Sequence, residues 1–209
     1  MKRFFNLFKD SAMELTGKGK IVCIVMTALL IALSMSIEAF SIDIPNVAKI
    51  NFAYIAIAAI GMLYGPTIGF FAGGICDVLG YMVHPDGAFL PLYTFIGMLQ
   101  GLIYGIVLYR KWGNINITEK GKRGRKLTEF AVRIIAARLL DVVIINLFLN
   151  TAANLHYGFI PEQAYGAAII ARIAKNALQL CADIPILLVI LPVIMGAYLK
   201  IFGKRQAAA

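Results

Sequence analysis

The chain has 209 residues, 60% of them hydrophobic, and its mean hydropathy is +0.80. This apolar share exceeds that of soluble domains, and the apolar blocks of about 20 residues match the thickness of a bilayer, so we interpret the chain as an integral membrane protein. The formal net charge of +9 raises nucleic-acid binding as an alternative, but the basic residues flank the apolar blocks, so we expect topology signals and no nucleic-acid partner.

The first apolar block predicts a membrane span over about Lys20–Ala39. No small-residue cleavage site follows it, which favours an uncleaved span over a signal peptide. We expect the basic residues 1–19 to form a cytoplasmic segment. Within the span, Ala28 and Ala32 make a small-residue step that allows close helix approach, either inside the bundle or toward a partner.

A loop over 41–50 separates this span from a short second one, 51–64, and the third is expected over Pro66–Val83. The third span contains Asp77 and Tyr81. An ionisable residue at membrane depth costs roughly 2.5–3.5 kcal/mol and normally faces a cavity or a partner. Asp77 is therefore either a pocket residue or a structural carboxylate paired with a cation of another span.

The fourth span, 89–109, carries no charge, and a basic cytoplasmic loop over 110–127 follows it. In the fifth span, 128–156, Asn146, Asn150 and Asn154 are spaced four apart and share one helical face. They are interpreted as pocket residues or as interhelical hydrogen-bonding groups. Arg138 and Asp141 are three apart, which predicts a local ion pair.

The last apolar segment ends near Phe202 and contains Pro185 and Pro192. One kinked helix is favoured over two, because it leaves 15 of the 20 Lys and Arg on one side and only Lys49 in the opposite loops. The prediction is an all-α, polytopic membrane protein. It has six transmembrane helices, both termini in the cytoplasm, and a single domain over 1–209.

A polar stripe begins the sixth span, and its members recur at three- or four-residue steps: Arg172, Lys175, Asn176, Gln179 and Asp183. With the predicted topology, the polar faces of spans three, five and six reach the same depth. We therefore expect a polar pocket open to the outside. As alternatives, Arg172 and Lys175 snorkel at the interface, and Asp183 hydrogen-bonds near the kink.

The sequence contains no phosphate-binding lysine loop, no HExxH and no GxSxG motif, and its acidic residues do not cluster as metal ligands. We expect no enzymatic activity, no cofactor and no metal.

Four segments together resemble a known family: TALLIALSMSIEAFS (27–41), the stretch 51–94 that includes GPTIGFFAGGICDVLGYMVHPDGAF (65–89), GLIYGIVLY (101–109) and NLFLNT (146–151). They look like the folate-binding S components of energy-coupling factor (ECF) vitamin transporters. The resemblance implies a six-helix bundle in the bacterial cell membrane that binds the vitamin from outside with high affinity. It also implies partners, namely a transmembrane coupling protein and two cytoplasmic ATPases, and a toppling motion that carries substrate inward. Ala28 and Ala32 would form the docking surface.

The pocket residues suit the chemistry of folate, whose pterin has a donor and acceptor edge and whose glutamate carries two carboxylates. We expect Asp77, Asn150 and Asn176 to read the pterin, with Tyr81 or Phe40 stacking on it. Arg172 and Lys175 would partner the anion or the pterin carbonyl. The loop 41–51, including Asn51, would close over the site.

Three other functions stay open. The first is an S component for another planar vitamin, such as thiamine or a queuosine precursor, although the cationic thiamine fits poorly beside Arg172 and Lys175. The second is a structural membrane protein without a ligand, and the third is an intramembrane enzyme, which the absent motifs argue against.

Overall fold

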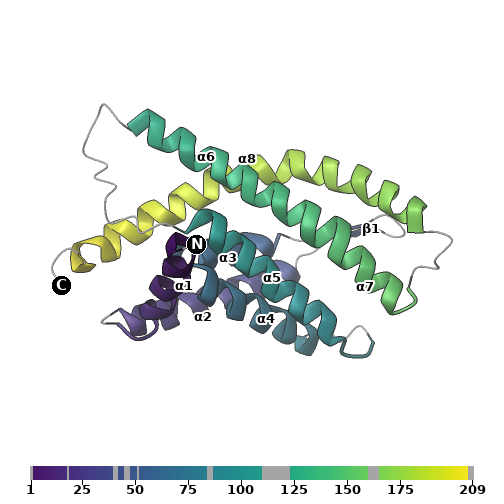
Figure 1. Cartoon of the computed structure of the whole chain (residues 1–209), viewed down its shortest axis with the longest axis horizontal. Helices are drawn as coiled ribbons and strands as arrows, with labels where there is room; N and C mark the ends of the chain where they lie inside the picture. The colour runs from purple at the N-terminus through teal and green to yellow at the C-terminus, as the bar shows by residue number, and fades with distance from the viewer. Residues whose placement is uncertain are drawn as a thin grey trace.

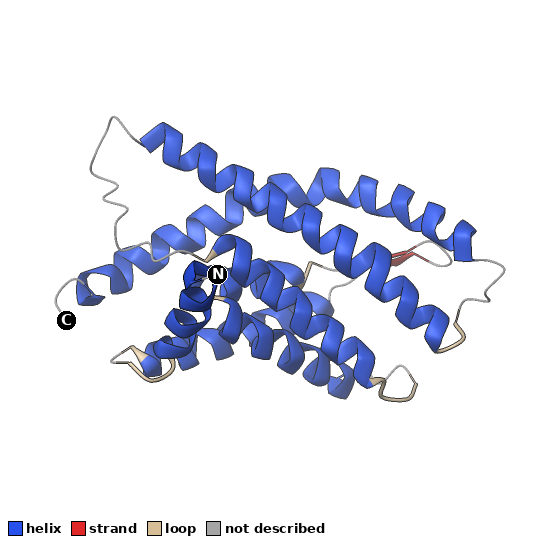
Figure 2. Cartoon of the chain, in the orientation of Figure 1, coloured by secondary structure: helices blue, strands red, loops and turns tan. Residues whose placement is uncertain are grey.

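The computed structural model describes residues 2–17, 19–39, 42–44, 48–50, 52–83, 87–109, 123–159 and 165–206. Helices account for nearly all of them (Figures 1 and 2), which confirms the predicted helical fold. The helices are α1 (Lys2–Glu14), α2 (Lys20–Ala39), α3 (Tyr54–Tyr64), α4 (Pro66–Val83), α5 (Pro91–Leu108), α6 (Arg123–Leu140), the π-helix η2 (Asp141–Leu149), α7 (Asn150–His156) and α8 (Tyr165–Gln206).

The loop expected between the first two spans contains a short β-ribbon, which the sequence did not predict. Strand β1 (Ile42–Ile44) pairs antiparallel with β2 (Ala48–Ile50), with Ile42 opposite Ile50. Both strands alternate isoleucine or alanine with one charged residue, the period-2 pattern of a strand with two different faces.

The short second span is an interior helix. Every residue of α3 is buried, as expected for a helix that is apolar all round. Its 11 residues are fewer than a bilayer crossing needs, and neighbouring helices of the bundle cover it. Gly65 ends it in a left-handed conformation (φ 88°), and Pro66 begins α4. The third span therefore has the predicted bounds, Pro66–Val83.

Glycines bring α4 and α5 into direct backbone contact. A Cβ atom on Gly101 would collide with the carbonyl oxygen of Gly69, and one on Gly73 would collide with that of Gly97. The small-residue pattern of these two spans therefore serves packing inside the bundle.

Helices α6, η2 and α7 follow one another without a gap from Arg123 to His156, so the fifth helical segment begins at Arg123 rather than at Thr128. Residues 110–122 of the predicted basic loop lie outside the described residues. The last segment is one helix of 42 residues with Pro185 and Pro192 inside it, as predicted. Figure 1 shows it bending midway, which is the effect of proline within a helix.

Among the described residues, four helices are long and apolar enough to cross a membrane: Lys20–Glu38, Pro66–Val83, Pro91–Leu108 and Ile169–Phe202. Helix α1 was not predicted from the sequence. It occupies most of the segment that precedes the first span.

Candidate functional site

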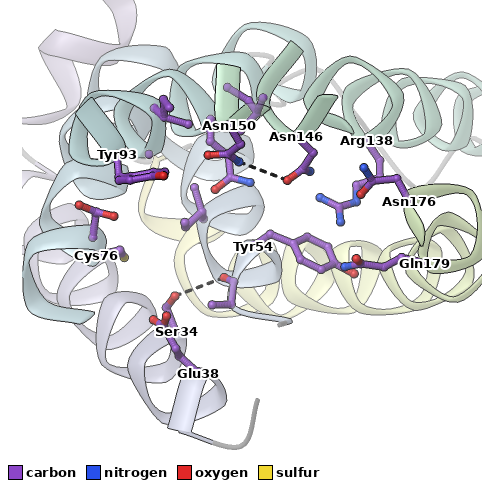
Figure 3. Close-up of a pocket in the computed structure, with 18 of the residues that line it drawn as sticks. Ser34, Glu38, Tyr54, Cys76, Tyr93, Arg138, Asn146, Asn150, Asn176 and Gln179 are labelled. Carbon is purple, nitrogen blue, oxygen red and sulfur yellow. Dashed lines mark hydrogen bonds between the residues drawn. The ribbon is translucent and has the colours of Figure 1, made fainter. Parts of the chain in front are cut away.

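A polar cavity of about 280 Å³ lies among the helices, and every helix from α2 to α8 contributes to its wall (Figure 3). Its size approaches the lower end of the usual range for small-molecule pockets. The polar and charged lining residues are Ser34, Glu38, Tyr54, Asp77, Tyr93, Gln100, Arg138, Asn146, Asn150, Lys175, Asn176 and Gln179.

Two carboxylates lie on the α2–α4 side of the cavity. Asp77 is half-buried, and its Oδ2 accepts a hydrogen bond from the Thr94 hydroxyl at 2.6 Å. Glu38, at the end of α2, approaches the backbone of α4 at Gly80. Carboxylate oxygens accept from ring N–H and amino groups, so this wall suits the donor edge of a ligand.

The wall formed by η2, α7 and α8 carries amides and cations. Asn150 donates to the side-chain oxygen of Asn146 at 3.4 Å, and Asn176, on α8, is buried. Lys175 also lines the cavity. Arg172 adjoins this wall, because its guanidinium donates to the backbone oxygen of Asn146 at 3.3 Å.

A helix with the π hydrogen-bond pattern positions the asparagines. Such segments are rare and occur frequently at functional sites. Asp141, Ile145 and Asn146 of η2, together with Asn150 just after it, all face the interior: Asp141 is fully buried and the other three line the cavity.

A buried charge cluster adjoins the cavity through Tyr54 and Arg138, and we define it as Tyr54, Tyr104, Arg138, Asp141 and Asp183. Arg138 pairs with Asp141 and with Asp183, each at 2.5 Å. The local Arg138–Asp141 pair predicted from the sequence is thus confirmed, and the structure adds the second carboxylate. Side chains of Arg138, Asp141 and Asp183 are at most 3% exposed.

The two tyrosines, together with Gln100 outside the cluster, donate further hydrogen bonds to its carboxylates. The Tyr54 hydroxyl donates to Asp183 at 2.7 Å, and the Arg138 guanidinium lies 3.8 Å from the centre of the Tyr54 ring. Tyr104 and Gln100 donate to Asp141 at 3.2 and 3.0 Å. Each carboxylate therefore accepts three hydrogen bonds, because Arg138 supplies the others. Such saturation offsets the cost of burying charge.

The structure brings together most of the site residues predicted from the sequence. Asp77, Asn150, Lys175 and Asn176 line one cavity, and Arg172 lies beside it. The expectation that three polar helix faces converge is met. Phe40 and Asn51 lie outside the described residues.

Tyr81 is the exception, and its stacking role stays a prediction that its contacts do not favour. It is not among the lining residues. Its hydroxyl donates to the Gly87 carbonyl at 2.9 Å, and its ring lies 5.2 Å from that of Phe89. These contacts hold the side chain over the turn between α4 and α5. Tyr93 is the aromatic residue of that region that does line the cavity.

Several lining residues were missed or assigned other roles. Gln100 is the single amide in the uncharged span 89–109. A lone polar side chain in an apolar span could have indicated a residue of the site. Glu38 was not among the predicted site residues but lines the cavity. Tyr54 and Arg138 contribute through contacts with residues far along the chain, which no local pattern reveals.

The predicted docking step lies on the outer face of α2. Ala28 and Ala32 are exposed, whereas Cys23 and Leu30 of the same helix are buried in the core. This exposure does not fit close packing of the two alanines inside the bundle, and it leaves contact with a partner as the alternative.

A bundle of membrane helices whose polar residues converge on a cavity of small-molecule size is typical of substrate-binding membrane transport proteins. Comparison with known proteins agrees. The family described as "ECF-type riboflavin transporter, S component" matches residues 18–196, and the chain belongs to this family.

Curated relatives carry the name folate transporter FolT. That of Clostridium novyi (strain NT) is 27% identical over 161 residues, which cover 77% of this chain and 82% of the relative. That of Streptococcus mutans is 35% identical over 95 residues, covering 44% of this chain and 51% of the relative. These are transport proteins, which confirms the expectation that the chain is not an enzyme.

A solved structure described as the crystal structure of FolT bound with folic acid superimposes with a TM-score of 0.61 at 26% identity. The superposition covers 77% of this chain and 88% of the FolT chain.

Proposed function

We propose that this S component captures folate from outside the cell in the cavity between its helices. One observation carries the proposal: carboxylates and cationic or amide groups occupy different walls of one cavity. Folate has matching ends, a pterin with N–H donors and a glutamate with two carboxylates.

Asp77 and Asn150 are assigned to the pterin edge together with Asn176. Asp77 uses one oxygen for Thr94, and the described part of the chain provides no hydrogen bond to the other. Lys175 and Arg172 are assigned to the ligand anion. Tyr93 replaces Tyr81 as the candidate for stacking on the flat ring, since it lies in the wall.

Riboflavin is the second candidate, because the matching family carries that name. Its ring system is also flat, but the molecule is neutral and would leave the cations of α8 without a ligand anion. Thiamine is cationic and would be repelled by Lys175 and Arg172, which disfavours it further.

Titration calorimetry of the purified full-length protein with folic acid, riboflavin and thiamine tests the assignment. We expect heat from folic acid at micromolar concentration or below, and none from the other two. Absence of heat with folic acid would overturn the proposal, and heat with riboflavin alone would replace it. A mass spectrum of small molecules co-purified with the protein provides an independent check.

Assembly into a transporter is the second part of the proposal. Six transmembrane segments in one domain, 1–209, with cytoplasmic termini in the bacterial cell membrane, would place Ala28 and Ala32 against a transmembrane coupling protein that carries two cytoplasmic ATPases. Docking on this module would drive the toppling motion that releases folate inward.

The exposure of both alanines on α2 supports this surface. We expect Ala28→Trp to prevent co-purification with the coupling protein while folic acid binding is retained. Complex formation by this variant would show that the docking surface lies elsewhere.

A further inference from the structure

Helix α1 is fixed to the junction between α3 and α4. The Ser11 side chain is fully buried; its hydroxyl donates to the Tyr64 carbonyl at 2.6 Å and accepts from the backbone N–H of Thr67 at 3.1 Å. The Thr67 hydroxyl donates in turn to the carbonyl of Phe8 at 3.2 Å. These bonds satisfy backbone groups that the end of one helix and the start of the next leave unpaired.

This attachment places α1 beside the first turn of α4. Helix α4 is a candidate membrane span that begins at Pro66, and the span of α2 begins at Lys20, shortly after α1 ends. Figure 1 shows α1 crosswise to these longer helices, near the end where they begin. A helix placed across the first turn of a membrane span lies at the boundary between hydrocarbon and water.

One face of α1 is apolar and only partly covered. Phe5, Phe8 and Ala12 recur at steps of three and four, so they share a face. Phe5 is 70% exposed, and Ala12 is also exposed. Lys9, which is exposed, lies on an adjoining row of the helix. Residues 1–20 contain five Lys and Arg against Asp10 and Glu14, so the segment is cationic.

We propose that α1 is an interfacial helix that inserts its Phe5–Phe8–Ala12 face into the headgroup boundary of an anionic bilayer. Lys9, on the adjoining row, pairs with a lipid phosphate. Amphipathic helices with aromatic residues on one face and Lys or Arg on the other bind membranes in this way. Through Ser11, the contact anchors the α3–α4 junction at the membrane surface.

The size of the face favours lipid over a protein partner. Its exposed part consists of one aromatic ring and one methyl group, whereas a stable protein interface needs about 800 Å² from each partner. Basic residues near an anionic membrane surface are attracted to it. A bilayer is already present beside α1, because α2 and α4 span it.

Quenching by brominated lipid tests the depth of this face. In a Trp112→Phe background, which removes the single tryptophan, Phe5→Trp places a reporter on the apolar face, and Asn6→Trp places a matched reporter on an exposed position of a different face. The full chain is reconstituted into nanodiscs of phosphatidylcholine and phosphatidylglycerol, with acyl chains brominated or not.

We expect the reporter at position 5 to lose about half of its emission or more, as a side chain inserted below the headgroups should, while the reporter at position 6 changes little. Equal, weak quenching at both positions would overturn the proposal, as would strong quenching at both. The proposal would also be overturned if the reporter at position 5 left the aqueous phase only after the coupling protein was added, because that result would indicate a protein contact.

A charge-reversal variant tests whether the basic side chain is required. Lys9→Glu should reduce quenching of the position-5 reporter in the anionic nanodiscs, with a smaller effect in pure phosphatidylcholine. Equal effects in both lipids would refute the electrostatic part. Each variant is compared with the parent by its thermal midpoint, and we expect no shift because these side chains are exposed.

Discussion

The buried charge cluster and the walls of the cavity both contain aspartates, but these differ in burial and in the number of hydrogen bonds that they accept from the protein. In the cluster, Asp141 and Asp183 are fully buried and each accepts three hydrogen bonds from protein groups. On the walls, Asp77 is half-buried and accepts one bond, from Thr94. A carboxylate saturated by its own protein holds helices together, whereas one with spare acceptor capacity beside a cavity is available to a ligand.

Removing the cation of the cluster should have the largest effect. Arg138→Ala leaves two buried carboxylates without compensation, so we expect the free energy of unfolding to fall by about 3–5 kcal/mol. The measurement is denaturant or thermal unfolding of the ligand-free protein. Arg138→Met combined with Asp141→Asn and Asp183→Asn should recover much of the loss. If Arg138→Ala were as stable as the parent, the cluster would not be structural.

The same substitution in the two regions sharpens the comparison. Asp183→Asn puts an amide where two donor groups need acceptors, and should cost about 1–3 kcal/mol of stability. Asp77→Asn keeps an acceptor for Thr94, so stability should hold while folic acid affinity falls about tenfold, or ~1.4 kcal/mol. Calorimetric titration and thermal midpoints separate the two results. A reversed pattern would exchange the roles of the two regions.

Arg172 tests the cationic wall. Arg172→Ala should weaken folic acid binding by about tenfold, because its guanidinium lies beside the cavity. The midpoint of the ligand-free protein should stay nearly unchanged, since the only bond lost in the described residues is a long one to Asn146. Lys200→Ala, which removes an exposed cation from the same helix, serves as the control. A large loss of stability without ligand would favour a structural role for Arg172.

Ionic strength should produce the smallest effect. Between about 50 and 500 mM NaCl, the association rate of folic acid should fall a few-fold, because salt screens attraction between an anion and partly solvated cations. Unfolding of the ligand-free protein should depend much less on salt, since the charges of the cluster are buried. Stopped-flow binding and thermal scans measure the two. A salt-independent association rate would argue against steering by Lys175 and Arg172.

Much of the helical framework follows from local sequence. The bounds of α4 coincide with the predicted span because Gly65 and Pro66 mark its start, and α2 is the predicted Lys20–Ala39. The asparagines of η2 and α7 and the stripe of α8 were expected in the site, because a helical period places residues three or four apart on one face. The Arg138–Asp141 pair was predictable for the same reason.

Other features depended on neighbours that no local pattern identifies. Tyr81 follows Asp77 by one helical turn, yet its ring is held at the α4–α5 turn by Gly87 and Phe89. Glu38 lies near the end of a span, where a carboxylate is normally solvated, but here it lines the cavity. Helix α1 was missed because its apolar residues are interrupted by charged ones and form no continuous apolar run, and its attachment through Ser11 exists only in the folded chain.

By itself, the sequence determined that this protein resides in a membrane, which segments are helical and which helix faces are polar, because hydropathy and helical period are properties of neighbouring residues. Only the tertiary structure decided which charges meet. Arg138 and Asp183 are 45 positions apart, and their contact depends on how α6 and α8 cross and rotate against each other. That packing also decided which carboxylates are saturated and which face the cavity.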